Sequence, residues 1–395
     1  MRHLTFLITA LSALFMLQPM PAVAVDCINA TPMQHTFDSG ASWAFCATLN
    51  EQHAMEISAL HYQAPGDSSR QVLQQLHLGQ LLLHYHDATE ATALIGAADP
   101  ASLIAVPLNN AVCTGELHSA TTMNNAFCSE VQNTGLLAKY NMRRGLQGQQ
   151  FRVFSVARYN GLTFQIGYGL SEDGRIAPYA SLSGQPTRSS NNPDFGNALI
   201  NPMSNAEIIG TQATLLYTWR MVFAMNGDGT DDSVEELNFN INPAAGNRRP
   251  MAVSQWQTET LRNTDRDQFR GWRIREPNGG GYYLDPQKSG YAFRDNTNNW
   301  AQFDLAITAY NECEQHSRMA GTESSTLAVN ECEGSLDNFV NGESLVSKQP
   351  VLWYSLSREF RPSAEDYPII SSMLTEFELL PFDWTNTSPF EVIRE

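Results

Sequence analysis

Short segments in which apolar and polar residues alternate recur along most of the chain. Clear examples, each bounded by clusters of Gly, Asn, Asp and Pro, are Met55–Tyr62, Phe151–Tyr168, Leu215–Met225 and Phe303–Ala309. Alternation places successive side chains on opposite faces of a strand, and few long runs have the period of a helix. The pattern predicts a mainly β protein and favours one large domain, although 395 residues could hold two or three.

Residues 1–24 have the pattern of a secretory signal peptide. Arg2 precedes an apolar run from Leu4 to Leu17, and the small residues Ala22-Val23-Ala24 suit a cleavage site. The apolar run is too short to span a bilayer, and no later run approaches twenty apolar residues. We therefore expect residues 25–395 to form a periplasmic or secreted domain that has no membrane span.

Six cysteines fall into three pairs of neighbours along the sequence. The pairs are Cys27 with Cys46, Cys113 with Cys128, and Cys313 with Cys332. This spacing suits three disulfides formed in an oxidising compartment. Each would close a loop of about 15 to 20 residues and add roughly 3 kcal/mol of stability by restricting the unfolded chain.

The chain is strongly acidic, with 24 Lys and Arg against 41 Asp and Glu and a net charge of −17. Removal of residues 1–24 would take away Arg2 and leave 23 basic residues against 41 acidic ones, a charge of −18. Nucleic acid and anionic membranes would be repelled, which argues against both as partners. A cationic small molecule such as an amine is compatible, as is the simpler alternative that the charge keeps a secreted protein in solution.

Four blocks of sequence motifs occur in a recognisable order. They are Cys113-Thr114-Gly115-Glu116-Leu117-His118 with Asn125-Ala126-Phe127-Cys128; Gly210-Thr211 with Trp219-Arg220-Met221 and Ser233-Val234-Glu235; Gly271-Trp272-Arg273-Ile274 with Glu276-Pro277-Asn278; and Val351-Leu352-Trp353-Tyr354 with Glu365-Asp366-Tyr367-Pro368. In these blocks the chain resembles the catalytic domain of the topaquinone-containing copper amine oxidases. The resemblance implies a large twisted β-sandwich over residues 25–395, with long hairpin arms that join two copies into a homodimer. Candidate arm or loop tips are Gly184–Asn197 and Gly321–Ser335, which are polar and rich in turn-forming residues.

The resemblance also implies a chemistry. Members of the family bind copper with three histidines, make topaquinone from one of their own tyrosines, and oxidise primary amines to aldehydes with release of ammonia and peroxide. The three ligand positions fall on Ala213, Leu215 and Phe360 in this chain. Copper(II) needs donors such as imidazole nitrogen, and apolar side chains cannot replace them. We therefore expect no metal site at these positions, and neither copper nor topaquinone as a cofactor.

Three further positions correspond to catalytic groups of the family. Tyr159, within Arg158-Tyr159-Asn160-Gly161, occupies the place of the cofactor tyrosine, but only the tyrosine of that four-residue motif is kept. Tyr85 precedes Asp99 by the 14 residues that separate the quinone-holding tyrosine from the catalytic base in the family. We interpret Tyr159, Asp99 and Tyr85 as vestigial, because an ordinary strand tyrosine and an Asp-Pro turn explain them as well.

A second kind of metal site is suggested by histidines elsewhere. His84 and His86 are two residues apart, so on a strand they would project from the same face. They could share a metal ion with His77 or His118, although a chance pair on an exposed strand is the simpler interpretation.

The acidic turn at Asp228, Asp231 and Asp232 is the remaining candidate for a metal. It lies where the family has a secondary calcium-type site, but Val222 and Ala224 replace the family's Asp-x-Asp. Weak calcium binding and a merely solvated turn are both compatible with this sequence.

The resulting prediction is a secreted member of the family that has lost copper, topaquinone and catalysis. Its role would be binding or structural, toward an unknown protein or a cationic small molecule. The alternative is an active primary amine oxidase with an atypical metal and quinone site built on Tyr159, Asp99 and Tyr85.

Overall fold

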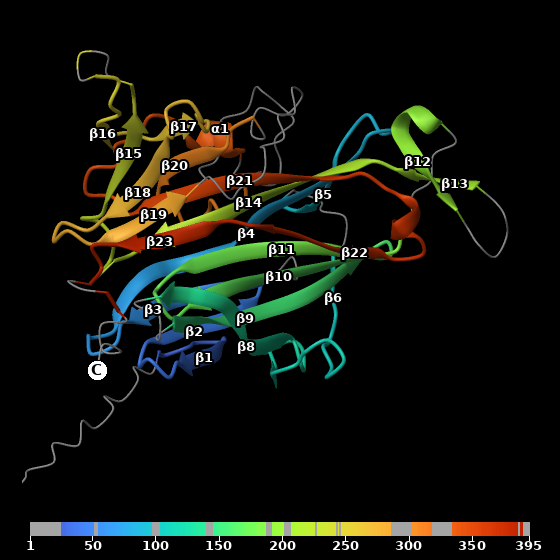
Figure 1. Ribbon diagram of the computed structural model, residues 1–395, viewed down its shortest axis with the longest axis horizontal. Helices are drawn as coiled ribbons and strands as arrows, with labels where there is room; N and C mark the ends of the chain where they lie inside the picture. Colours follow the sequence, from blue (N-terminus) through green and yellow to red (C-terminus); the bar gives the residue numbers. More distant parts are fainter. Residues whose placement is uncertain are drawn as a thin grey trace, which may run out of the picture.

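Two large antiparallel sheets face each other in the computed structural model of the chain (Figure 1). The structure describes residues 25–50, 54–96, 103–139, 145–186, 192–200, 207–225, 227–241, 244, 246–285, 302–317, 334–385 and 388–389. Nearly all the elements within these ranges are strands, which confirms the mainly β prediction and the β-sandwich that the resemblance implied.

The first sheet has nine strands. In spatial order they are β1 (Thr31–Thr36), β2 (Ser42–Leu49), β3 (Met55–Gln63), β4 (Arg70–Tyr85), β14 (Ala213–Phe223), β21 (Pro350–Phe360), β20 (Leu305–Ala309) and β17 (Thr260–Arg262), with β5 (Thr92–Ile95) paired to β4. The centre of this sheet therefore joins β4, β14 and β21, three strands that lie far apart in the sequence.

The second sheet has twelve strands. In spatial order they are β16 (Met251–Trp256), β15 (Ser233–Phe239), β18 (Gly271–Arg275), β19 (Gly281–Asp285), β23 (Glu378–Phe382), β11 (Ile176–Gly184), β10 (Leu162–Ser171), β9 (Gly145–Tyr159), β8 (Phe127–Lys139) and β7 (Glu116–His118), with β22 (Ile370–Glu376) paired to β11 and β6 (Ile104–Ala105) to β9. The predicted segment Phe151–Tyr168 is thus two strands, β9 and β10, which a tight turn at Asn160 and Gly161 separates.

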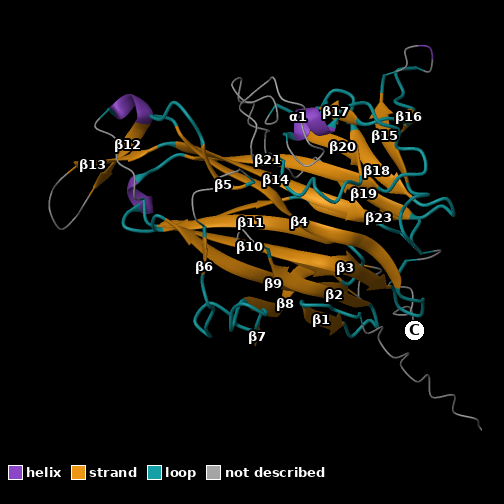
Figure 2. Ribbon diagram, turned by 180° about the vertical axis from the view of Figure 1, so that it is seen from behind, coloured by secondary structure: helices purple, strands orange, loops and turns teal. Residues whose placement is uncertain are grey.

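A separate two-stranded hairpin, β12 (Gly196–Ile200) with β13 (Glu207–Thr211), projects from one end of the sandwich (Figures 1 and 2). The predicted tip Gly184–Asn197 covers only the approach to this hairpin, because the connection between its strands comes later, at residues 201–206, outside the described residues. Of the second predicted tip, Gly321–Ser335, only the last two residues are described.

Helical elements are short in the described ranges: η1 (Pro193–Phe195), α1 (Leu336–Phe339) and η5 (Ala364–Asp366). No helix there is long and apolar enough to cross a membrane.

Strand β14 forms the centre of the core, with every side chain buried. Tyr217, Trp219 and Met221 lie between the two sheets, where Tyr168 of β10 packs edge-on against Trp219 with 5.8 Å between ring centroids. Leu216 and Val222 point to the opposite face of the sheet, beneath α1 and its flanking segments. Burial on both faces explains the long apolar run of this strand, because each buried large side chain contributes about 1.5–3 kcal/mol.

Two of the three predicted disulfides are confirmed. Cys27 is bonded to Cys46 and Cys113 to Cys128, each with 5.5 Å between the Cα atoms. Cys313 is also disulfide-bonded, but Cys332 lies outside the described residues, so that pairing stays a prediction.

Candidate functional site

Three of the residues singled out in the sequence lie in one row across neighbouring strands. Ala213, at the start of β14, is the cross-strand partner of both Tyr85 on β4 and Phe360 on β21. Directly opposed residues in an antiparallel pair project from the same face of the sheet. Ala213 and Phe360 belong to the core between the sheets, and Tyr85 packs against that core.

The row continues into a wholly apolar cluster. Leu215 lies two residues beyond Ala213 on the same face of β14 and is 0% exposed, while Ala213 and Phe360 are 1% and 6% exposed. None of these three side chains has a nitrogen, oxygen or sulfur atom that could bind a metal. The residues at the predicted ligand positions therefore do not fit copper.

Tyr159 is the last residue of β9 and packs, partly buried, against the same core from the second sheet. It pairs with Leu162, and the two residues between them, Asn160 and Gly161, have φ values of 44° and 83°. Positive φ at both central residues is what a two-residue type I′ hairpin requires. The residues at the predicted place of the cofactor motif therefore make a strand turn, and Asp99 lies outside the described residues.

Of the histidines proposed as a second metal site, only His84 and His86 lie close together, with 6.3 Å between ring centroids. His86 Nε2 lies 2.9 Å from Thr214 Oγ1 and His84 Nε2 lies 3.2 Å from the carbonyl of Ala88. His118 belongs to the other sheet, and His77 Nε2 donates to the carbonyl of Gln315 at 2.7 Å. Within the described ranges, no three His, Cys, Asp or Glu side chains form a group that could hold a metal ion.

In the acidic turn, the carboxylates of Asp228 and Asp232 accept hydrogen bonds from nearby residues of the chain. Asp228 Oδ1 accepts hydrogen bonds from the amide and the hydroxyl of Thr230, at 3.0 and 2.8 Å. Asp232 Oδ2 accepts from the amide of Met225 at 3.0 Å, and burial raises the pKa of Asp232 to about 7. The described carboxylates of this turn do not form a group of three that could hold a metal ion, and calcium binding there stays a prediction.

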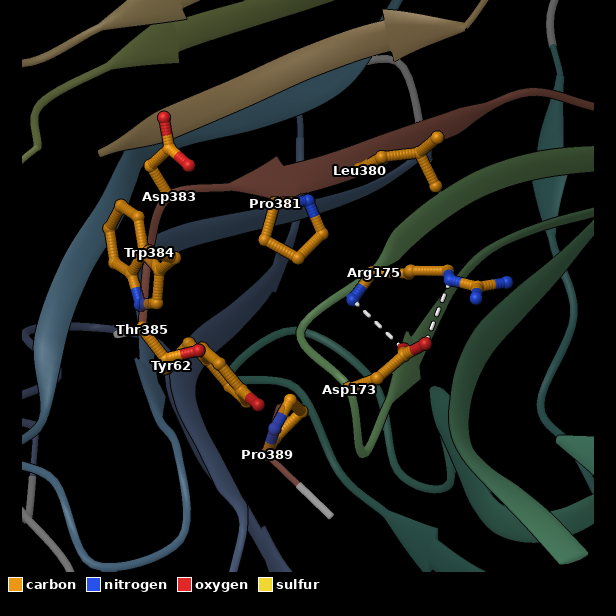
Figure 3. A pocket seen from close by; sticks show the side chains of 9 residues that line it. All are labelled: Tyr62, Asp173, Arg175, Leu380, Pro381, Asp383, Trp384, Thr385 and Pro389. Carbon is orange, nitrogen blue, oxygen red and sulfur yellow. Dashed lines mark hydrogen bonds and ion pairs between the residues drawn. The ribbon is translucent and has the colours of Figure 1, made fainter. Parts of the chain in front are cut away.

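A pocket at the opposite end of the sandwich was not predicted from the sequence (Figure 3). It encloses about 360 Å³ between Tyr62 of β3, the turn that connects β10 to β11, and the residues after β23. Tyr159 precedes β10 and Asp173 follows it, so the length of this ten-residue strand, roughly 33 Å, separates the pocket from the row described above.

Aromatic rings and carboxylates line this pocket. Figure 3 shows Tyr62 and Trp384 on one side and Asp173, bonded to Arg175, on the other. Asp173 Oδ2 accepts from Arg175 Nε at 2.8 Å, and burial raises the pKa of Asp173. Asp383 adds a second carboxylate. The residues that line the pocket come from three segments that lie far apart in the sequence and share no motif. Sequence patterns therefore do not predict this pocket.

Solved structures share this fold. The chain superposes on a copper-containing benzylamine oxidase from Hansenula polymorpha with a TM-score of 0.66 and 15% identity, over 94% of this chain and 64% of the other. It superposes on the lysyl oxidase of Pichia pastoris with a TM-score of 0.68 and 14% identity, over 88% of this chain and 52% of the other. The fold is therefore that of the copper-dependent amine oxidases, here with apolar residues at the predicted ligand positions.

The chain belongs to the copper amine oxidase family, because the model of the copper amine oxidase enzyme domain matches residues 39–394. A primary amine oxidase and a copper methylamine oxidase, both of Arthrobacter sp. (strain P1), are each 22% identical to it, over 88% of this chain and 59% of the relative. The chain thus spans about 59% of the length of these curated relatives.

Proposed function

We propose that this protein is a member of the copper amine oxidase family that binds a ligand or partner and does not oxidise amines. The observation that carries the proposal is the apolar cluster of Ala213, Leu215 and Phe360 at the predicted ligand positions. Topaquinone is made in the family by copper acting on the tyrosine, so a chain that cannot hold copper there lacks the means to make it. The type I′ turn after Tyr159 supports the same conclusion.

The proposed setting is the periplasm or the extracellular medium, reached after removal of residues 1–24. Two disulfides within the described residues suit that oxidising compartment. We also propose that the protein is a homodimer, as the family resemblance implies, with the projecting β12–β13 hairpin as its arm.

The experiment that tests the proposal combines metal content with chemistry. The purified protein is loaded with copper, desalted and examined by elemental analysis, by amine-dependent peroxide release and by peptide mass spectrometry. We expect less than stoichiometric copper, no peroxide and an unmodified Tyr159. One copper per chain, with a Tyr159 peptide heavier by two oxygens less two hydrogens, would instead establish the active oxidase that uses Tyr159, Asp99 and Tyr85.

The ligand class that the structure supports is a small organic cation bound in the pocket of Figure 3. Two carboxylates against one guanidinium leave the lining acidic, and the whole chain is acidic too. Arg70 Cζ already lies 4.1 Å from the centroid of the Trp384 ring, and Trp384 is only 5% exposed, so the bound cation is expected to contact the carboxylates and not the indole face.

Titration calorimetry with butylammonium tests this assignment. Asp173→Asn should weaken binding about tenfold or more, the equivalent of 1.4 kcal/mol for a lost charge contact. Asp231→Asn removes the same charge from an exposed turn and should leave the affinity unchanged. Equal effects of the two substitutions would show that only the net charge attracts the cation.

A further inference from the structure

A serine and a histidine form a hydrogen-bonded pair at the edge of the twelve-stranded sheet. The Nε2 atom of His118 on β7 lies 2.7 Å from the Oγ atom of Ser129 on β8. With the imidazole proton on Nδ1, the Ser129 hydroxyl donates to Nε2. This is the contact that a general base makes with the nucleophile it activates.

Strand geometry places a carboxylate beside the pair. Glu116 is the direct cross-strand partner of Ser129, and Glu116 and His118 are two residues apart on β7. All three side chains therefore project from the same face, while Leu117 and Cys128 pack on the opposite face. The Cys113–Cys128 disulfide joins the residues just before β7 to β8 and holds the two strands in this register.

The charge state of His118 suits a general base. Burial lowers the pKa of His118, and the Glu116 carboxylate opposes that shift only in part, so the imidazole is neutral at neutral pH. The other titratable side chain that faces this space is His35 on β1; Glu130 of β8 also borders the cavity, but its carboxylate lies on the Cys128 face, where it accepts hydrogen bonds from Thr114 and Gln132. Burial lowers the pKa of His35 as well, so it adds no positive charge there at neutral pH.

The pair opens onto a cavity that nothing described above uses. It has a volume of about 430 Å³ and lies between edge strand β1 of one sheet and strands β7, β8 and β9 of the other, at the lower edge of the view in Figure 2. Met33, His35 and Phe151 give it an apolar wall, in which the His35 ring stacks on Phe151 with 4.8 Å between centroids. The Thr31 hydroxyl, which donates to the carbonyl of Ser119 at 2.6 Å, closes one end of the interface between β1 and the β7 region.

We propose that Ser129 and His118 are the nucleophile and general base of a second site, one that cleaves small uncharged carboxylic esters. The Ser129 oxygen bonds to the ester carbonyl carbon while its proton passes to His118 Nε2. The bond to the alkoxy group breaks, and the alcohol leaves with that proton. Water then attacks the acyl-serine, giving its proton to His118, and the carboxylic acid departs as Ser129 is restored.

The surroundings define the substrate class. Glu116 at the cavity would repel an anionic substrate, and the wall of Met33, His35 and Phe151 favours an apolar acyl group. The cavity volume lies within the range of small-molecule sites, so a short acyl chain fits.

The test uses the full-length protein with a fluorophosphonate probe, which reacts with activated serines, and with p-nitrophenyl butyrate as substrate. Peptide mass spectrometry should locate the probe on Ser129, and Ser129→Ala should abolish both labelling and ester turnover. His118→Asn keeps a hydrogen-bonding group but cannot take up the proton, so labelling should slow about 100-fold or more.

A matched control is available on another strand. The Ser372 hydroxyl on β22 is also hydrogen-bonded to a side chain, that of Ser181, and Ser372→Ala should label and turn over ester like the parent protein. Thermal unfolding of each variant separates loss of function from loss of the fold. The proposal is overturned if Ser129 stays unlabelled in the folded protein, or if folded Ser129→Ala retains ester turnover.

Discussion

At the scale of single residues, the side chains at the predicted ligand positions have become part of the core. Leu215 shares its face of β14 with Ala213 and faces the second sheet, where a polar ligand would need its own partners. The three positions lie close in space although about 145 residues of sequence separate Leu215 from Phe360. The predicted ligand positions are thus filled by hydrocarbon side chains.

A core role makes a quantitative prediction for Leu215. Truncation to alanine in a fully buried site leaves a cavity and should lower the free energy of unfolding by about 3 kcal/mol. Leu374→Ala is the matched control, because Leu374 on β22 is 41% exposed and should cost no more than about 0.5 kcal/mol. Urea unfolding measures both, and a Leu215 effect as small as the control would mean that this position does not support the core.

At the scale of elements, local patterns predicted strands well and strand ends less well. The alternation from Phe151 to Tyr168 was predicted correctly as β structure, yet it runs straight through the turn between β9 and β10. The Asn160-Gly161 dipeptide was the available signal, since these residues readily adopt positive φ. The resemblance interprets these residues as part of a degraded cofactor motif. In the structure they form the turn between β9 and β10.

Sites that several elements share could not be predicted in the same way. The prediction of the copper positions rests on motifs, because one motif frame fixes Ala213 and Leu215 and the closing motif fixes Phe360. The pocket of Figure 3 and the cavity beside Ser129 each need a strand from both sheets, and sequence spacing says nothing about which edges meet. Asp99 and Cys332 stay predictions, because they lie outside the described residues.

At the scale of the whole molecule, a polar layer lies on the outer face of the nine-stranded sheet. Glu56, His77, Arg220 and Trp353 are successive cross-strand partners on β3, β4, β14 and β21. The segment that carries His316 packs over them, and the rings of His77 and His316 lie 6.1 Å apart between centroids. The sequence showed Arg220 only as part of a family motif, and its burial among polar partners became visible only in the fold.

This layer predicts how stability depends on pH. Burial and the Arg220 charge lower the pKa of His77 to about 3, and burial and the neighbouring His77 lower the pKa of His316 to about 4. Unfolding restores pKa values near 6.5, so the unfolded chain binds more protons in acid. Stability from these neutral histidines is complete above pH 6.5 and is lost as the pH falls from there toward 3.

Urea unfolding at a series of pH values measures this effect. Each histidine should lower the free energy of unfolding by up to about 1.4 kcal/mol per pH unit between pH 6 and 4, and a His77→Gln, His316→Gln double variant should flatten that decline. Glu314 depends on pH in the opposite direction, because burial raises its pKa to about 8. The stability that its neutral form contributes is lost as the pH rises from 4.5 through 8, and Glu314→Gln should remove that loss. If the double variant declines in acid as steeply as the parent, carboxylates elsewhere in this acidic chain set the acid limit and the buried histidines do not.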